Sequence, residues 1–112
     1  MNIKTILLPM DFSESNNAAL EYASSLASET GATLYIVHAD EMEQIADVMA
    51  KAGHPYPSPW DDKGRHECHV KLKKIVPTVQ GVKYRHFYLK GTPTGKIVSF
   101  AERKGVDLIV MA

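Results

Sequence analysis

The sequence predicts a three-layer α/β/α protein built on an open parallel sheet. Short apolar runs alternate with longer segments whose apolar residues recur at helical spacing. The resulting order, β-α-β-α-β-α-β, favours parallel strands joined by right-handed crossovers. With 112 residues, the chain is expected to form a single domain.

The first strand is expected over residues 3–9, because the run Ile6-Leu7-Leu8 is short and is closed by Pro9. A turn at Asp11-Phe12-Ser13 follows. Ser13 is the expected N-cap of the next helix, because a serine side chain accepts hydrogen bonds from the first free N–H groups.

That helix is expected over residues 14–30, and Gly31 is expected to end it. Its apolar face is rich in small residues and therefore suited to close packing on a sheet. The residues of this face are Ala19, Tyr22, Ala23, Leu26 and Ala27. Residues 33–38, rich in β-branched and aromatic side chains, predict a second buried strand.

The stretch from Asp40 to Gln80 is less regular. A short amphipathic helix is expected there, with an apolar face of Met42, Ile45, Val48 and Met49. The segment 53–59 must break this helix, because it holds three prolines in five residues. A further helix is expected to begin at Ser58-Pro59 and to reach about Val76.

The last part of the chain predicts a strand, a helix and a strand. Residues 82–90 alternate, with Tyr84, His86 and Tyr88 on one face and Arg85, Phe87 and Leu89 on the other. Thr92-Pro93 opens a helix that carries Ile97, Val98 and Ala101 and that Gly105 closes. Residues 107–112 predict the fourth strand.

Composition excludes several classes of function. The chain has 13 basic and 13 acidic residues and a formal net charge of zero, which gives no electrostatic case for nucleic acid or an anionic membrane surface. No apolar run approaches the roughly 20 residues of a membrane span, and residues 1–4 do not resemble a signal peptide. The single cysteine, Cys68, excludes an internal disulfide, so a reducing cytoplasm is the expected compartment.

Four motifs, spaced in order along nearly the whole chain, resemble the universal stress protein family. They are Ile6 to Glu14, Gly31 to His38, Gly91-Thr92-Pro93 with Ile97, and Asp107 to Met111. The resemblance implies a nucleotide-binding, Rossmann-like fold of the adenine nucleotide alpha hydrolase type, with five parallel strands in the order 3-2-1-4-5. It also implies that many members bind ATP while others do not, and that members commonly form homodimers.

The resemblance places a ligand crevice beyond the carboxyl ends of the first and fourth strands, as is typical of open parallel sheets. Pro9 and Ala39 would line the base, Asp11 would contact adenine or ribose, and Met111 would complete this base side. The full candidate set is Pro9, Met10, Asp11, His38, Ala39, Met111 and Ala112.

In ATP-binding members, a glycine-rich segment that follows the fourth strand holds the phosphates. The sequence ends at Ala112, before any such segment, so residues 1–112 are expected to be a C-terminally incomplete domain with the base-side half of the site. ATP is therefore a possible ligand whose phosphate-binding loop is absent from this chain.

Several of these residues also have purely structural interpretations. Asp11 can orient the turn before the first helix. A strand-end histidine such as His38 is expected to bond to the backbone. Thr92 and Thr94 are expected to cap the last helix rather than to contact phosphate.

No metal site or catalytic site is expected. His54, His66, Cys68 and His69 include metal-ligating types, but no paired Cys-x-x-Cys or His-x₃-His spacing occurs. No partner is placed to activate Cys68 as a nucleophile. Slow ATP hydrolysis is the most that an enzymatic interpretation allows, because no general base is positioned at a phosphate site.

Two interpretations of function remain open. In the first, the chain is a stress-response domain that, when complete, binds ATP or another adenine nucleotide. In the second, it is a homodimeric stress or interaction protein without a bound nucleotide. The second is favoured by residues 108–111, which would form an exposed apolar edge that a swapped strand, a tail or a partner chain should cover.

Overall fold

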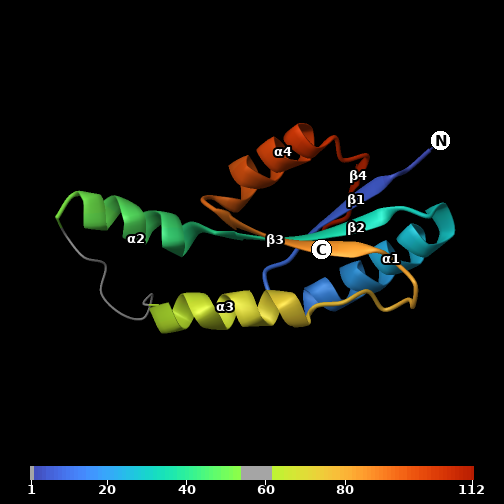
Figure 1. Cartoon of the computed structure of the whole chain (residues 1–112), viewed down its shortest axis with the longest axis horizontal. Helices are drawn as coiled ribbons and strands as arrows, with labels where there is room; N and C mark the ends of the chain where they lie inside the picture. The colour runs from blue at the N-terminus through green and yellow to red at the C-terminus, as the bar shows by residue number, and fades with distance from the viewer. Residues whose placement is uncertain (1, 54–61) are drawn as a thin grey trace.

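The computed structural model describes residues 2–53 and 62–112, and Figure 1 shows their arrangement. The strands are connected by helices as predicted, with two helices, α2 and α3, between β2 and β3. The elements are β1 (Thr5–Pro9), α1 (Ser15–Thr30), β2 (Thr33–Asp40), α2 (Glu41–Lys51), α3 (Asp62–Lys74), β3 (Tyr84–Lys90), α4 (Pro93–Lys104) and β4 (Leu108–Ile109). No helix in this part of the chain is long and apolar enough to span a membrane.

The strands form one parallel sheet in the order β3-β2-β1-β4, which confirms the order that the family resemblance implied for these four strands. β1 is central and pairs on both sides, with Ile6 opposite Leu34 of β2 and Leu108 of β4. The Asp107 carboxylate strengthens the start of the β1–β4 pair. Its Oδ2 accepts the N–H groups of Lys4 at 2.8 Å and Thr5 at 3.0 Å.

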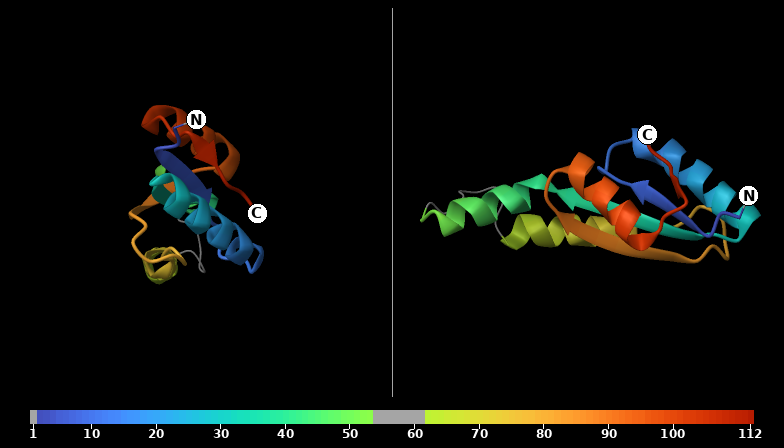
Figure 2. Two further views of the ribbon diagram at one scale, coloured as in Figure 1. Left: turned by 90° about the vertical axis from the view of Figure 1, so that its right-hand side faces the viewer. Right: turned by 90° about the horizontal axis from the view of Figure 1, so that it is seen from above.

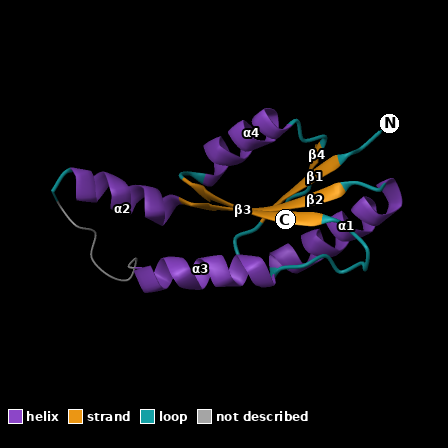
Figure 3. Ribbon diagram, viewed as in Figure 1, coloured by secondary structure: helices purple, strands orange, loops and turns teal. Residues whose placement is uncertain are grey.

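Helices cover the two faces of the sheet, with α1 and α3 on one side and α4 on the other (Figures 1 and 3). Ile6, Leu8 and Leu34 face α1 and α3, whereas Leu7 and Val37 face α4. The small side chains of α1 let this helix approach the sheet closely, and those in the core are Ala19, Ala23 and Ala27.

Two predictions about α1 are wrong. Ser13 is not the N-cap, because Glu14 occupies that position without a side-chain cap, and the Ser13 hydroxyl bonds Asp11 instead. Tyr22 does not join the core, since 63% of its surface is exposed. The predicted end of the helix at Gly31 is confirmed, with a left-handed φ of 73°.

α2 extends beyond the end of the sheet, as Figure 2 shows from above, whereas α3 packs on the sheet through Leu72. The expected amphipathic helix is confirmed as α2, and its side chains Ile45, Val48 and Met49 are exposed. α2 ends at Lys51, before the break predicted at residues 53–59. Residues 54–59 of that break and the predicted helix start at Ser58 lie outside the described residues. α3 ends at Lys74, earlier than the predicted Val76.

The last three elements follow the prediction with local differences. In β3, Tyr88 packs toward α1 and α3 while Phe87 and Leu89 pack toward α4, so the predicted alternation is confirmed. Thr92 occupies the N-cap position of α4, but its side chain makes no capping hydrogen bond. β4 spans only two residues rather than six.

Phe100 anchors α4 to the sheet, because its ring is 1% exposed and packs 4.7 Å from the ring of Phe87 and 6.3 Å from that of Tyr35. We predict that Phe100→Ala lowers the free energy of unfolding by about 3–5 kcal/mol, as measured by urea denaturation. Val98→Ala, on the exposed side of α4, should change it by less than about 0.5 kcal/mol. Equal losses in the two variants would contradict this role for Phe100.

Candidate functional site

The carboxyl ends of β1, β2 and β4 meet at one end of the sheet and border a cavity of about 210 Å³. The order of the strands reverses at β1. β2 and β3 follow one another on one side of β1, and β4 lies on its other side. Ligands bind at such positions in open parallel sheets. All seven candidate residues border this cavity, namely Pro9, Met10, Asp11, His38, Ala39, Met111 and Ala112. The structure therefore brings them together, and their role in binding stays a prediction.

Three residues that were not in the candidate set also line the cavity. Pro93 and Ile97 come from the first turns of α4, within a motif that the sequence already singled out. Asn16 comes from the first turn of α1 and is 4% exposed. The sequence feature that could have identified Asn16 is its helical spacing from Ala19 and Ala23, which places a polar side chain on the buried face of α1.

The cavity has an apolar part and a polar part. The apolar part is formed by proline, alanine, isoleucine and methionine side chains, those of Pro9, Ala39, Pro93, Ile97 and Met111. The polar part is formed by Asp11, Asn16 and His38. Among the described residues that line the cavity there is no lysine or arginine, so the cavity offers no cationic side chain to an anion.

Asp11 is exposed and is held by the loop that follows β1. Its Oδ1 accepts the Ser13 hydroxyl at 2.6 Å and the Ser13 N–H at 2.9 Å. The Ser13 hydroxyl, followed by the Ser13 N–H, lowers the pKa of Asp11 below its ordinary value, with a smaller contribution from His38. The carboxylate is therefore ionised at neutral pH, and the turn-forming interpretation of Asp11 is confirmed.

The backbone of the same loop is tied to α1. The Asp11 N–H donates to Oδ1 of Asn16 at 2.8 Å. This hydrogen bond fixes Asp11 beside the first turn of the helix, so the positions of the two polar side chains are coupled.

His38 bonds to the backbone, as the sequence predicted. Its Nδ1 lies 2.7 Å from the Met10 carbonyl oxygen. Because a carbonyl oxygen can only accept, Nδ1 must carry the proton, which leaves Nε2 as the acceptor of the neutral ring. The ring packs between Phe12, at a centroid distance of 4.5 Å, and Tyr88, at 5.5 Å.

Phe12 adopts a left-handed backbone conformation with φ of 65°, which costs a non-glycine residue about 1–2 kcal/mol. This conformation reverses the chain, so that the Asp11 carboxylate reaches the N–H and hydroxyl of Ser13. The contact of the Phe12 ring with His38 offsets part of that cost.

Cys68 and His69 belong to the packing of α3 on β3. His69 stacks on Tyr88 at 3.7 Å, and the Tyr88 hydroxyl donates to the buried Asp40 carboxylate. Burial raises the pKa of the Cys68 thiol, and the Asp40 carboxylate raises it further. A thiol of this kind is a weak nucleophile.

Among the side chains that the structure describes within residues 2–53 and 62–112, no three potential metal ligands lie close together. His54, one of the four residues considered as ligands, lies outside the described residues. The absence of a metal site therefore stays a prediction.

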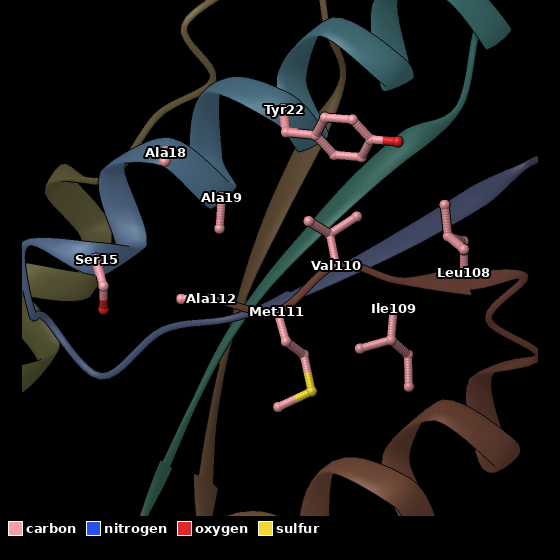
Figure 4. Close-up of a pocket in the computed structure, with 9 residues that line it drawn as sticks. All are labelled: Ser15, Ala18, Ala19, Tyr22, Leu108, Ile109, Val110, Met111 and Ala112. Carbon is pink, nitrogen blue, oxygen red and sulfur yellow. The ribbon is translucent and has the colours of Figure 1, made fainter.

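A second depression of about 640 Å³ runs between α1 and β4 (Figure 4). Ser15, Ala18, Ala19 and Tyr22 form one side, and residues 108–112 form the other. This groove borders the edge of β4 that does not pair with β1. Tyr22, whose side chain is exposed, lines this groove.

Residues 2–112 match the sequence model of the universal stress protein family. The chain is 33% identical to Universal stress protein MJ0531 of Methanocaldococcus jannaschii and 31% identical to Universal stress protein YxiE of Bacillus subtilis, each over 113 residues. These alignments cover 96% and 95% of this chain, but 63% and 76% of the two relatives.

Solved structures agree in fold. The structure of MJ0577 from Methanocaldococcus jannaschii superposes with a TM-score of 0.76 at 26% identity, over 99% of this chain and 75% of that one. A universal stress protein in complex with cAMP superposes with a TM-score of 0.60 at 19% identity, over 97% of this chain and 72% of that one. The sequence and the fold agree, and the chain belongs to the universal stress protein family.

Proposed function

We propose that the cavity at the ends of β1, β2 and β4 binds the nucleoside part of an adenine nucleotide, and that the protein uses this binding in a cytoplasmic stress response. The observation that carries the proposal is the ionised Asp11 carboxylate beside an apolar cavity at the reversal of strand order. A base would lie against the apolar wall, whereas a carboxylate accepts hydrogen bonds from hydroxyl or amino groups.

The size and charge of the cavity favour a nucleoside over a whole nucleotide. Its volume of about 210 Å³ falls below the range of about 300–1,000 Å³ that is typical of small-molecule sites. The lining side chains that are described include no cation to neutralise phosphates. If ATP binds, its phosphates lie beyond these residues. A universal stress protein with the same fold forms a complex with cAMP, and this supports an adenine nucleotide as the class of ligand.

A second candidate function is homodimerisation through the groove beside β4. Ile109 is 38% exposed and Met111 is 64% exposed, and both lie along this groove. The edge of β4 that faces away from β1 presents N–H and C=O groups that a strand of a second copy can pair with. The groove beside it accepts apolar side chains.

We predict that Asp11→Asn weakens the binding of adenosine about tenfold, since a hydrogen bond to a charged group is worth about 1.5–3 kcal/mol. Isothermal titration calorimetry measures the change. Glu14→Gln is the matched control, because Glu14 is exposed in the same loop but does not line the cavity. Equal affinity of Asp11→Asn and wild type would rule out a contact with this carboxylate.

We predict that adenosine affinity is constant between about pH 7 and pH 5 and falls only in more acidic solution. The pKa of Asp11 is lowered, so the ionised form persists until the pH falls through that lowered value. Ser13→Ala removes the largest cause of the shift and should move the loss of affinity to higher pH. Ser25→Ala, an exposed change on α1, should leave the profile unchanged, and coincident Ser13→Ala and Ser25→Ala profiles would contradict the assignment.

For the second candidate, we predict that the wild-type protein sediments as a dimer and that Ile109→Lys shifts it toward the monomer. A lysine at this position places a charge in the apolar groove of each copy. Sedimentation velocity over a concentration series measures the effect. Val98→Lys, at a position of α4 that is 50% exposed and does not line the groove, should leave the dimer intact, and a monomeric wild type would exclude this candidate.

A further inference from the structure

Asn16 is a polar residue at a position where the fold requires burial. It lies on the stripe of α1 that faces the core, one turn before Ala19, and only 4% of its surface is exposed. The other buried residues of α1 are three alanines and Ser24, and the Ser24 hydroxyl accepts a hydrogen bond from the Thr78 N–H at 3.0 Å. An amide here must therefore be explained by its hydrogen bonds.

The loop after β1 provides a hydrogen-bond partner for only one of the two polar atoms of the Asn16 side chain. Its Oδ1 accepts the Asp11 N–H at 2.8 Å, which also identifies the other amide atom as Nδ2. Nδ2 has no acceptor among the described residues, although it carries two N–H groups. A buried donor without a partner is destabilising, so a group outside these residues is expected to accept its hydrogen bond.

The cavity is where such an acceptor can be placed. Asn16 lines it together with Asp11, and the Asp11 N–H bond holds the two residues side by side. Asp11 is an ionised carboxylate that can only accept, and Oδ1 is its oxygen engaged by Ser13. Nδ2 of Asn16 can only donate. A matching ligand group offers a donor and an acceptor on adjacent atoms.

We propose that Asn16 is a ligand-binding residue of this cavity, whose Nδ2 donates to one hydroxyl oxygen of a ribose while the neighbouring hydroxyl donates to Asp11. This inference rests on the proposed function and extends it, because the two side chains together select a vicinal diol. The sugar rather than the base takes this position, since the apolar wall of Pro9, Ala39 and Ile97 accommodates a flat ring.

The test compares adenosine with 2′,3′-dideoxyadenosine, which lacks both hydroxyls. In the wild-type protein, adenosine should bind at least about tenfold more tightly than the dideoxy probe. The side-chain amide protons of Asn16, assigned by their loss from the NMR spectrum of Asn16→Asp, should shift on addition of adenosine. They should shift far less with the dideoxy probe.

Asn16→Asp retains an acceptor for the Asp11 N–H, and in its ionised form it cannot donate from the position of Nδ2. It should reduce adenosine affinity about tenfold and shrink the preference for adenosine over the dideoxy probe. Asn17→Asp is the matched control, since it makes the same change at the next residue, which is exposed and does not line the cavity. It should change affinity less than about twofold.

The outcomes separate the two levels of the proposal. If the wild-type protein does not bind adenosine, the proposed function fails and this inference fails with it. If adenosine binds but the Asn16 amide does not shift, or Asn16→Asp weakens both probes equally, Asn16 has only a structural role and this inference alone is overturned. Unchanged adenosine affinity in Asn16→Asp overturns it as well.

Discussion

The position of β1 between two partners is the constraint on which the candidate site depends. Ile6, Leu7 and Leu8 are fully buried, and β1 bonds to β2 on one side and to β4 on the other. Ile6 and Leu8 fill the core beneath α1 and α3, while Leu7 fills the core beneath α4. A shift by one residue would exchange these faces, so the apolar pattern fixes the register. The end of β1 is consequently fixed in space.

The loop that follows β1 converts this fixed end into a set of oriented polar groups. Phe12 takes an unfavourable backbone conformation, and the hydrogen bonds that surround it require that conformation. The Asp11 carboxylate bonds forward to Ser13, while the Asp11 N–H bonds to Asn16. Strain of this kind persists where neighbouring structure over-determines it, and such positions occur at functional sites. The strain, the polar groups and the cavity coincide in this loop.

The sequence pattern predicted the alternating strands and helices, and the family resemblance implied their order in the sheet. Apolar runs located the strands, and the ends of parallel strands necessarily meet at one side of the sheet. The sequence did not reveal which hydrogen-bond partners the side-chain hydroxyl and amide groups have. Ser13 has the chemistry of an N-cap, yet its hydroxyl bonds Asp11, because Phe12 reverses the chain before the helix begins. Asn16 was missed since its importance depends on burial, which periodicity indicates only in outline.

The charges around the cavity also restrict how a nucleotide can be oriented in it. The carboxylate of Asp11 is ionised, and the lining side chains that are described include no lysine or arginine. Phosphate oxygens beside Asp11 would place like charges together without compensation, which is unfavourable in a partly desolvated site. The base and the sugar are uncharged and can occupy this space, whereas the phosphates must point away from Asp11. In the proposed complex, the affinity that these residues contribute therefore arises from apolar burial and a few hydrogen bonds, and it should depend little on salt.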